Sequence, residues 1–316
     1  MRIEYHRTLI ADLVRNAAFH AALKAAIVPG VTTVADIGAG TGLLGLMAAR
    51  LGAKDVFLYE TAEVAGVAAQ ILHRNRARNC HVFPCHSTEM DDPPRVDVVV
   101  SETLGNYALE ENILETAKDA VARHLKPGGA LIPRQVIQRV CPVVTSRIQE
   151  EFCAWDRVGL DLGLDMDLSP AKAMSMNNIY VRSFQPVDFL DQMMAAKAWD
   201  TIDLLRDHRA TRKAELKWAI GDHQTIHGFA IWWDVELATG ITLSTAPDAP
   251  RTHWEQLYLP LLHPFTCRAT ETLALSIRSK SSSEAGTHLA WTASRMDARG
   301  KSLERQSLDL DKGFLP

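Results

Sequence analysis

The sequence predicts an α/β fold in two parts, a doubly wound parallel sheet over residues 1–133 and a mostly antiparallel β domain over residues 134–316. In the first part short apolar strands alternate with helices, which is the order of βαβ units. One of these strands, VDVVV at 96–100, shows no polar alternation and is therefore expected to be buried on both faces. In the second part apolar residues recur at every other position, as in HGFAIWWDVELATG at 227–240, which is typical of a barrel or sandwich.

The elements of the first part follow one another closely. A helix rich in alanine and leucine comes first, and Pro29-Gly30 is expected to end it. In chain order we expect a helix over about 5–28, a strand at 31–38, a helix over 41–53, a strand at 55–60, a helix over 62–77, strands at 81–85 and 96–102, and a helix over 111–125 that Pro127-Gly128-Gly129 closes.

The second part contains several strand-like segments and one long insertion. The insertion, residues ~158–200, is irregular and helical by turns, and it is long for a loop inside a compact domain, so we expect it to have a purpose of its own. The strand-like segments are 136–144, 227–240, 255–262, 271–279 and 288–296.

The composition is that of an ordinary globular protein, with 47% hydrophobic residues, 23% charged residues and a net charge of −4. No long basic run marks a nucleic-acid surface, and no apolar run approaches the ~20 residues of a membrane helix. The five cysteines lie at irregular spacing, which favours free thiols and a cytoplasmic location. His223 and His227 fall near a predicted strand rather than on a helix, so we expect no metal site.

A glycine-rich loop in VADIGAGTGLLG lies between the first predicted strand and the helix that follows. We call Gly38, Gly40 and Gly42 the glycine loop, because they let the chain turn tightly and let a ligand approach the backbone and the helix amides. Glu60 ends the next strand, where an acid can bind a ribose diol. The geometry also suits NAD, but the GxGxG spacing with Asp36 just before it resembles class I S-adenosylmethionine (SAM) methyltransferases.

Two glutamates flank a second loop. Glu102 follows the buried strand at 96–100, at the sheet edge where ligands of open α/β folds bind. Glu111 is expected in the first turn of a helix, where an acid is favoured by the helix dipole alone. A loop that doubles back at Gly105 could nonetheless bring the two carboxylates together, and close carboxylates are costly without a cation between them. A planar guanidinium group suits that gap.

With these residues the chain resembles the protein arginine methyltransferases. The family's loop S-E-x-x-G-x-x-x-x-x-E, its Thr-His-Trp loop and its D-x-x-R helix motif all have counterparts here, in the family's order. The matching residues are Asp12, Arg15, the glycine loop, Glu89 in HSTEM, Ser101, Glu102, Gly105, Glu111, Thr252, His253 and Trp254.

The resemblance implies a Rossmann-like SAM-binding domain with an N-terminal helix at 1–133. Arg15 would hold the SAM carboxylate, and the glycine loop would pass beneath the methionine and ribose portions, with Asp36 among the cofactor-binding residues. Glu60 would hold the ribose hydroxyls and Glu89 the adenine amine.

The resemblance also implies a site for arginine. Glu102 and Glu111 would clamp the guanidinium group, and Trp254 would wall its pocket. His253 would pair with Asp12 and so close the N-terminal helix over the site. Either Glu111 or His253 could accept the proton that the methylated product loses.

The second part, 134–316, would then be the family's β-barrel, and the insertion at about 158–200 would contain the helical arm of a homodimer. The chain departs from the family at Thr103 and Asn106, which are small and polar where bulky or aromatic residues are usual. Because both are expected beside the arginine pocket, the substrate stays open between a protein, a peptide and free arginine. A methyltransferase with another small-molecule acceptor, or a silent SAM-binding relative, is the alternative.

Overall fold

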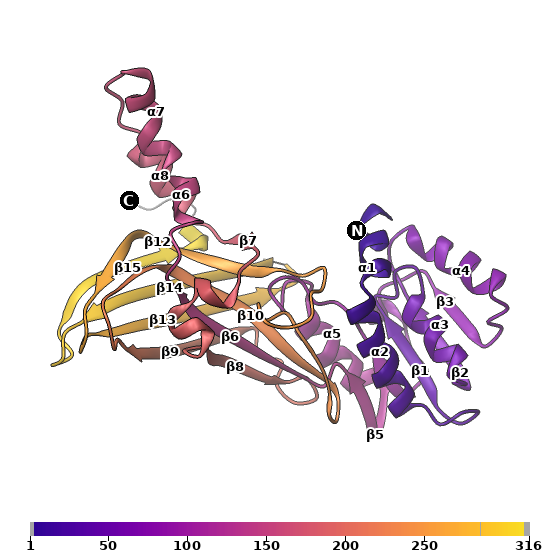
Figure 1. The fold of residues 1–316 in the computed structure, drawn as a ribbon. Coiled ribbons are helices and arrows are strands. Elements are labelled where there is room, and N and C mark those ends of the chain that lie inside the picture. Colours follow the sequence, from indigo (N-terminus) through magenta and orange to yellow (C-terminus); the bar gives the residue numbers. More distant parts are fainter. Residues whose placement is uncertain (1–2, 285, 313–316) are drawn as a thin grey trace.

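The computed structural model describes residues 3–284 and 286–312. Its first part is a parallel sheet, as the alternating pattern predicts, and its five strands have the order β3-β2-β1-β4-β5 (Figure 1). The strands are β1 Thr33–Ile37, β2 Asp55–Tyr59, β3 Cys80–Phe83, β4 Val96–Val100 and β5 Leu125–Ile132.

The register of this sheet brings the predicted site residues to one edge. Asp36 of β1 pairs with Val100 of β4, and Ile37 pairs with Tyr59 of β2. The chain therefore leaves three neighbouring strands at the same level, into the glycine loop, Glu60 and Glu102. Because β1 lies between its two partners, the glycine loop is central among them.

Helices pack against this sheet, and the N-terminal one differs from the prediction. The single helix expected over about 5–28 is two helices, because Asp12 adopts an extended conformation (φ −78°, ψ 91°) and caps the second helix with its side chain. The helical elements are α1 Ile3–Ala11, α2 Leu13–Ala26, α3 Leu43–Arg50, α4 Val64–Arg74, the 3₁₀ turn η1 Ser87–Glu89, α5 Ile113–Asp119 and the π-helical turn η2 Ala120–His124.

Two boundaries near the second loop also differ from the prediction. Helix α5 begins at Ile113, so Glu111 lies before the helix and not in its first turn. The cause is Asn112, which adopts the left-handed conformation (φ 61°) that asparagine tolerates better than most residues and that cannot continue a helix. The segment 127–129, expected to close the helix at 111–125, lies within β5 at a shift in its register with β4.

The antiparallel part begins immediately after the parallel sheet and consists of two sheets. One has the order β7-β12-β10-β6-β8, with β11 beside β10, and the other the order β15-β14-β13-β9. The strands are β6 Gln135–Val143, β7 Tyr180–Arg182, β8 Lys197–Asp203, β9 Thr211–Ala219, β10 Gln224–Ala238, β11 Ile241–Ser244, β12 Gln256–Cys267, β13 Thr272–Ser282, β14 Gly286–Met296 and β15 Ser302–Asp309; short 3₁₀ turns are η3 Pro186–Asp188, η4 Leu190–Met193 and η5 Leu310–Lys312.

A helical arm projects from this β domain, as Figure 1 shows for its three helices. They are α6 Gln149–Phe152, α7 Ala154–Leu162 and α8 Ser169–Met176. The arm therefore starts and ends earlier than the expected 158–200, because residues from 180 onward return to the sheets as β7 and β8. A separate cluster of buried residues, including Phe152, Met176 and Trp232, fixes the base of the arm to the β domain.

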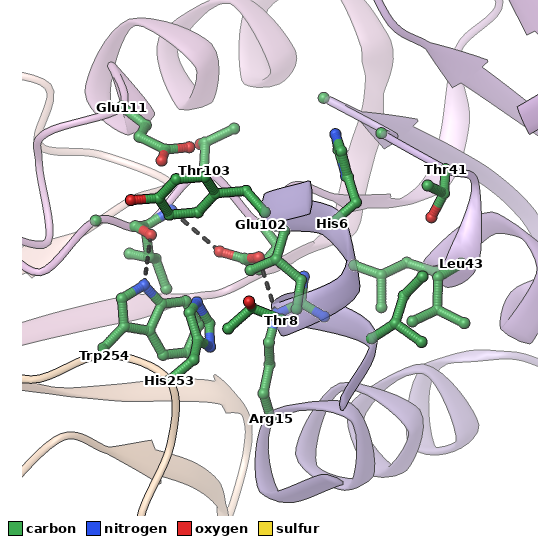
Figure 2. Close-up of a pocket in the computed structure, with 18 of the residues that line it drawn as sticks. His6, Thr8, Arg15, Thr41, Leu43, Glu102, Thr103, Glu111, His253 and Trp254 are labelled. Carbon is green, nitrogen blue, oxygen red and sulfur yellow. Dashed lines mark hydrogen bonds and ion pairs between the residues drawn. The ribbon is translucent and has the colours of Figure 1, made fainter. Parts of the chain in front are cut away.

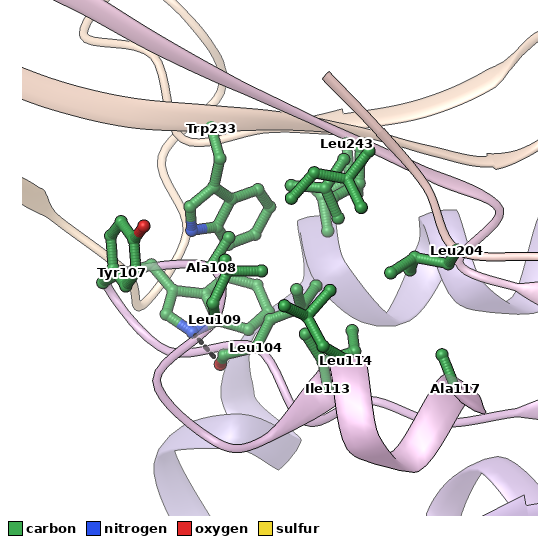
Figure 3. Packing of buried hydrophobic residues seen from close by; sticks show 14 of the residues in the cluster. Leu104, Tyr107, Ala108, Leu109, Ile113, Leu114, Ala117, Leu204, Trp233 and Leu243 are labelled. Atoms are coloured by element: carbon green, nitrogen blue, oxygen red, sulfur yellow. Dashed lines mark hydrogen bonds between the residues drawn. The ribbon is translucent and has the colours of Figure 1, made fainter. Parts of the chain in front are cut away.

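The two parts share one hydrophobic core, and the loop between β4 and α5 lies inside it. Leu104, Tyr107 and Leu109 of this loop pack with Trp233 of β10 and Leu243 of β11 (Figure 3). Both parts of the protein therefore position the loop that carries Glu102 and Glu111.

The remaining expectations concern the chemistry and surroundings of the chain. All five cysteines are free. Within residues 3–284 and 286–312, no helix is long and apolar enough to cross a membrane. The same residues form no group of three or more His, Cys, Asp or Glu side chains that could hold a metal ion. The cytoplasmic location stays a prediction.

Candidate active site

A cavity of about 640 Å³ lies at the carboxyl edge of the parallel sheet, between helix α1, the glycine loop and the start of β12 (Figure 2). It brings together most of the predicted site residues, although they come from segments far apart in the sequence. Those that line it are Arg15, Asp36, Gly38, Gly40, Glu60, Glu102, Thr103, Asn106, Glu111, His253 and Trp254.

The glycine loop and Glu60 form one side of the cavity. The Gly40 amide donates a hydrogen bond to Glu60 Oε2 (2.8 Å), and the Ala62 amide donates to Oε1 (2.8 Å), so the carboxylate is fixed beside the loop. Gly40 has φ +55°, and a Cβ atom there would lie 2.9 Å from His6 Cε1. Only glycine therefore lets helix α1 approach the loop this closely.

Asp36 lies beneath the loop and acts on its structure. Its carboxylate accepts a hydrogen bond from the Gly45 amide (2.8 Å), which satisfies the start of helix α3. Burial raises the pKa of Asp36 to about 7, against the opposing effect of that hydrogen bond. The structure thus gives Asp36 a supporting contact, while the role in cofactor binding stays a prediction.

Glu102 already has a counter-charge. Arg15 donates from Nε to Glu102 Oε2 (2.9 Å) and forms an ion pair with the same oxygen through Nη2; both side chains are only 6% exposed. The other oxygen, Oε1, accepts from the Leu104 amide (3.2 Å). A buried carboxylate needs such partners, because an isolated charge there would be strongly destabilising.

Glu111 has no such counter-charge. Its side chain lines the same cavity as Glu102, and Figure 2 shows both carboxylates facing into it. Among the described residues it has no hydrogen-bond or ion-pair partner, although the residue as a whole remains exposed. Desolvation of the carboxyl group, followed by the negative charges of Glu102 and Glu110, raises the pKa of Glu111 to about 7. The cavity therefore favours a cation next to Glu111.

Asp12 joins the N-terminal helices to the β domain. Its Oδ1 accepts from the Arg15 amide (2.9 Å) and so caps helix α2, while Oδ2 accepts from the His253 amide and from His253 Nδ1 (2.8 Å each). Burial acts to raise the pKa of Asp12, but these hydrogen bonds outweigh it and lower the pKa below its usual value. The structure thus brings Asp12 and His253 together as the resemblance implies.

Three further bonds hold the loop between β4 and α5 against the β domain. Trp254 Nε1 donates to the Leu104 carbonyl (2.9 Å), and Trp233 Nε1 donates to the Gly105 carbonyl (3.0 Å). The Asn106 side chain accepts from the Glu255 amide (2.9 Å). Asn106 therefore binds backbone rather than only lining the pocket, which explains a small polar residue at this position.

The small size of Thr103 also has a spatial reason. A Cβ atom on Gly38 would lie 3.0 Å from Thr103 Cγ2, so the two loops are in close contact at this point. Its neighbour Ser101 donates to the Ile37 carbonyl (2.9 Å) and ties the loop to β1.

Two predicted cofactor residues lie outside the cavity lining. Gly42 caps helix α3 in the left-handed conformation, behind the loop. Glu89 accepts a hydrogen bond from the His86 amide (3.0 Å) and is exposed, so its contact with adenine stays a prediction.

Sequence reasoning missed His6. Its ring lies against Gly40, it lines the cavity, and its Nε2 atom is buried without a hydrogen-bond partner. Burial lowers the pKa of His6, although Glu60 opposes this. The one sequence signal was its place on the N-terminal helix, six residues before Asp12, and that alone does not show which residue the helix turns towards the loop.

Comparison with known proteins gives matches to methyltransferases. Residues 139–293 match the family model described as the arginine methyltransferase oligomerization subdomain, and residues 21–158 match the model of the ribosomal protein L11 methyltransferase. An arginine N(omega)-methyltransferase of Streptomyces achromogenes subsp. streptozoticus is 30% identical over 283 residues, covering 86% of this chain and 75% of that protein. The chain belongs to the protein arginine N-methyltransferase family.

Other members show how widely the similarity extends. Protein arginine N-methyltransferase 6 of Xenopus tropicalis is 29% identical over 267 residues, covering 82% of this methyltransferase and 78% of the relative. The fold is shared with a Trypanosoma brucei PRMT1 enzyme–prozyme heterotetrameric complex with AdoHcy, at a TM-score of 0.85, 23% identity and 98% coverage of both chains. Protein arginine methyltransferase 10 of Arabidopsis thaliana has the same fold, at a TM-score of 0.81, 21% identity and 98% coverage of both.

Proposed function

We propose that this SAM-dependent arginine methyltransferase acts on arginine within a peptide or protein, and that Glu102 and Glu111 grip the guanidinium group. The observation that carries the proposal is the pair of carboxylates in one cavity, of which Glu102 is balanced by Arg15 and Glu111 by no described residue. A guanidinium group supplies the missing charge and has the planar donor geometry that two carboxylates can share.

The residues around the glycine loop fit SAM. Gly38 and Gly40 line the cavity without side chains, Glu60 offers a fixed carboxylate for ribose hydroxyls, and His6 lines the same cavity. Arg15 offers the positive charge that a SAM carboxylate needs. When bound, SAM supplies a methyl group on a positively charged sulfonium.

The protein's own part in the reaction is to polarise and orient the guanidinium group. A free guanidinium is a weak nucleophile because its charge is delocalised and its pKa exceeds about 12. Two carboxylates on two of its nitrogens draw the positive charge towards them, which leaves more lone-pair character on the third. Holding that nitrogen in place adds proximity catalysis. Glu111 and His253 both line the cavity, and either can take the proton that the product loses.

The charge of the cavity favours arginine that lacks a free carboxylate. Among the described lining residues, Glu110, Glu111 and Glu255 add acids on the more exposed side, and Arg15 is the only Arg or Lys. The α-carboxylate of free arginine would meet these acids with no further Arg or Lys among the described lining residues, and its own α-ammonium group would offset only part of the repulsion between like charges. The Streptomyces relative differs from this proposal, because its name gives arginine as the substrate.

An acceptor assay tests this choice. With labelled SAM, we expect Nα-acetyl-arginine amide to be methylated with a kcat/KM at least about tenfold higher than free arginine, because only the free amino acid carries an α-carboxylate. Equal or better use of free arginine would contradict the peptide assignment. Labelling of neither compound, nor of an arginine-containing peptide, would instead indicate a different small-molecule acceptor or a silent SAM-binding relative.

We also propose that the chain forms a homodimer through its arm. The matched subdomain is one of oligomerisation, and the arm exposes apolar side chains that a monomer would leave in water. Leu160 is 82% exposed and Leu162 is 64% exposed, while the arm's base is well packed.

In sedimentation analysis we expect twice the chain mass of 34.9 kDa, and the single-chain mass for the double variant Leu160→Asp/Leu162→Asp. A dimer that survives both changes would place the interface elsewhere.

A further inference from the structure

The loop that carries both glutamates has a buried tether on its far side. Tyr107 lies between Glu102 and Glu111, points away from the cavity and is 2% exposed. Its hydroxyl donates to Ser279 Oγ of β13 (2.7 Å) and accepts from Gln138 Nε2 of β6 (3.4 Å). Figure 3 shows Tyr107 at the end of the loop, and its ring stacks on Trp199 of β8 (6.5 Å between ring centroids).

This tether continues into a buried ion pair. Gln138 Nε2 also donates to Asp200 Oδ2 of β8 (3.3 Å), and Arg212 of β9 donates to both oxygens of Asp200 (2.8 and 2.6 Å). The Arg212 side chain is only 3% exposed and also pairs with Asp207 (2.9 Å). The four strands belong to both antiparallel sheets, so the loop is bonded to the place where these sheets meet.

Stability alone does not call for such a network. Buried ion pairs and hydroxyl groups cost desolvation, and apolar residues of similar volume are often as stabilising. What directional bonds add is a single defined arrangement, provided that the polar groups are satisfied. Here the group that is fixed is the middle of the loop, close to both clamp residues in the sequence.

We propose that Tyr107 is a positioning residue for methyl transfer, and that its bond to Ser279 sets where Glu111 stands relative to Glu102. The proposal rests on the clamp proposed above and adds a residue that does not touch the substrate. Because the glutamates must share one planar cation, a small shift of the loop changes the fit of the guanidinium group without altering the cofactor side of the cavity.

The test compares two buried tyrosines. Tyr107→Phe removes the tether, whereas Tyr258→Phe removes a buried hydroxyl that donates to the His227 carbonyl (2.8 Å) near the base of the arm. For Tyr107→Phe we expect kcat/KM for an arginine peptide to fall about tenfold or more, with SAM affinity unchanged within about twofold. Tyr258→Phe should lower the melting temperature by about as much as Tyr107→Phe does, and it should leave kcat/KM unchanged.

Ser279→Ala removes the same bond from the other side and keeps the test available if Tyr107→Phe does not fold. It should reproduce the kinetic loss, and the double variant should add little to it, because the two residues share one interaction. Wild-type kcat/KM in folded Tyr107→Phe, or equal kinetic losses in Tyr107→Phe and Tyr258→Phe, would overturn the proposal. Full activity of Glu111→Gln would instead overturn the clamp itself, so the two failures are distinguishable.

Discussion

Replacing Glu111 by glutamine is expected to lower methyl transfer to an arginine peptide by at least about a hundredfold, because the amide keeps the shape of the side chain but not its charge. SAM binding should remain, since Arg15, Glu60 and the glycine loop are unchanged. Glu102→Gln should cause a similar loss, as it removes the other carboxylate of the clamp. Rates and SAM affinities are to be measured separately, by product formation and by calorimetry.

Glu115→Gln is the matched control for this prediction. It removes the same charge from the first turn of α5, where Glu115 accepts from the Ser283 amide (3.1 Å) and, among the described residues, from no other; it lies outside the cavity. We expect near-normal turnover from this variant. Near-normal turnover from Glu111→Gln as well would exclude a clamp that depends on charge.

The raised pKa of Glu111 gives this prediction a pH signature. With a pKa near 7, the carboxyl group is largely protonated in acid and must lose its proton to bind a guanidinium cation. In the wild type, kcat/KM should therefore rise with pH through about 7, and Glu111→Gln should lack this step. Because the pKa of Glu111 is higher in the folded protein than its usual value, its protonated carboxyl group stabilises the folded state at low pH. This stabilisation is lost as the pH rises through about 7. The variant should thus be at least as stable as the wild type at pH 8.

Asp12→Ala is expected to lower the free energy of unfolding by about 2.5–4 kcal/mol. Loss of an N-cap costs about 0.5–2 kcal/mol, and the two lost bonds from His253 add about 1 kcal/mol each. SAM affinity should fall at least about tenfold, because α1 and α2 carry His6 and Arg15 over the cavity and would no longer be fixed to the β domain. Asp12→Asn should cost less, since asparagine is also a good cap.

Asp97→Ala separates this effect from general destabilisation. Asp97 likewise accepts three hydrogen bonds, from the amide and hydroxyl of Thr33 and from Lys126, but at the opposite edge of the parallel sheet. Its loss should lower stability and leave SAM affinity unchanged. If Asp12→Ala also leaves SAM affinity unchanged, the N-terminal helices are not held over the cavity by this contact.

The parts of the fold that follow from local patterns were predictable from the sequence. Apolar runs bounded by turns predicted the parallel strands, and the glycine spacing predicted the loop at the edge of β1. The pairing of Asp12 with His253 came from matching motifs, because no local rule links residues 241 positions apart.

Other features depend on contacts that no short segment contains. The break at Asp12 was hidden because its neighbours continue a helical pattern, and the cap is fixed by His253 from the β domain. Glu111 was expected on the helix because the left-handed Asn112 leaves no clear mark in the sequence. The bond of Tyr107 to Ser279 spans 172 positions and had no signal at all.

The most direct test of the clamp is a crystal structure with S-adenosylhomocysteine and an arginine peptide bound. We expect the guanidinium group between Glu102 and Glu111, with each carboxylate about 2.7–2.9 Å from a guanidinium nitrogen. A peptide arginine that contacts only one of the two carboxylates, or lies outside this cavity, would contradict the account.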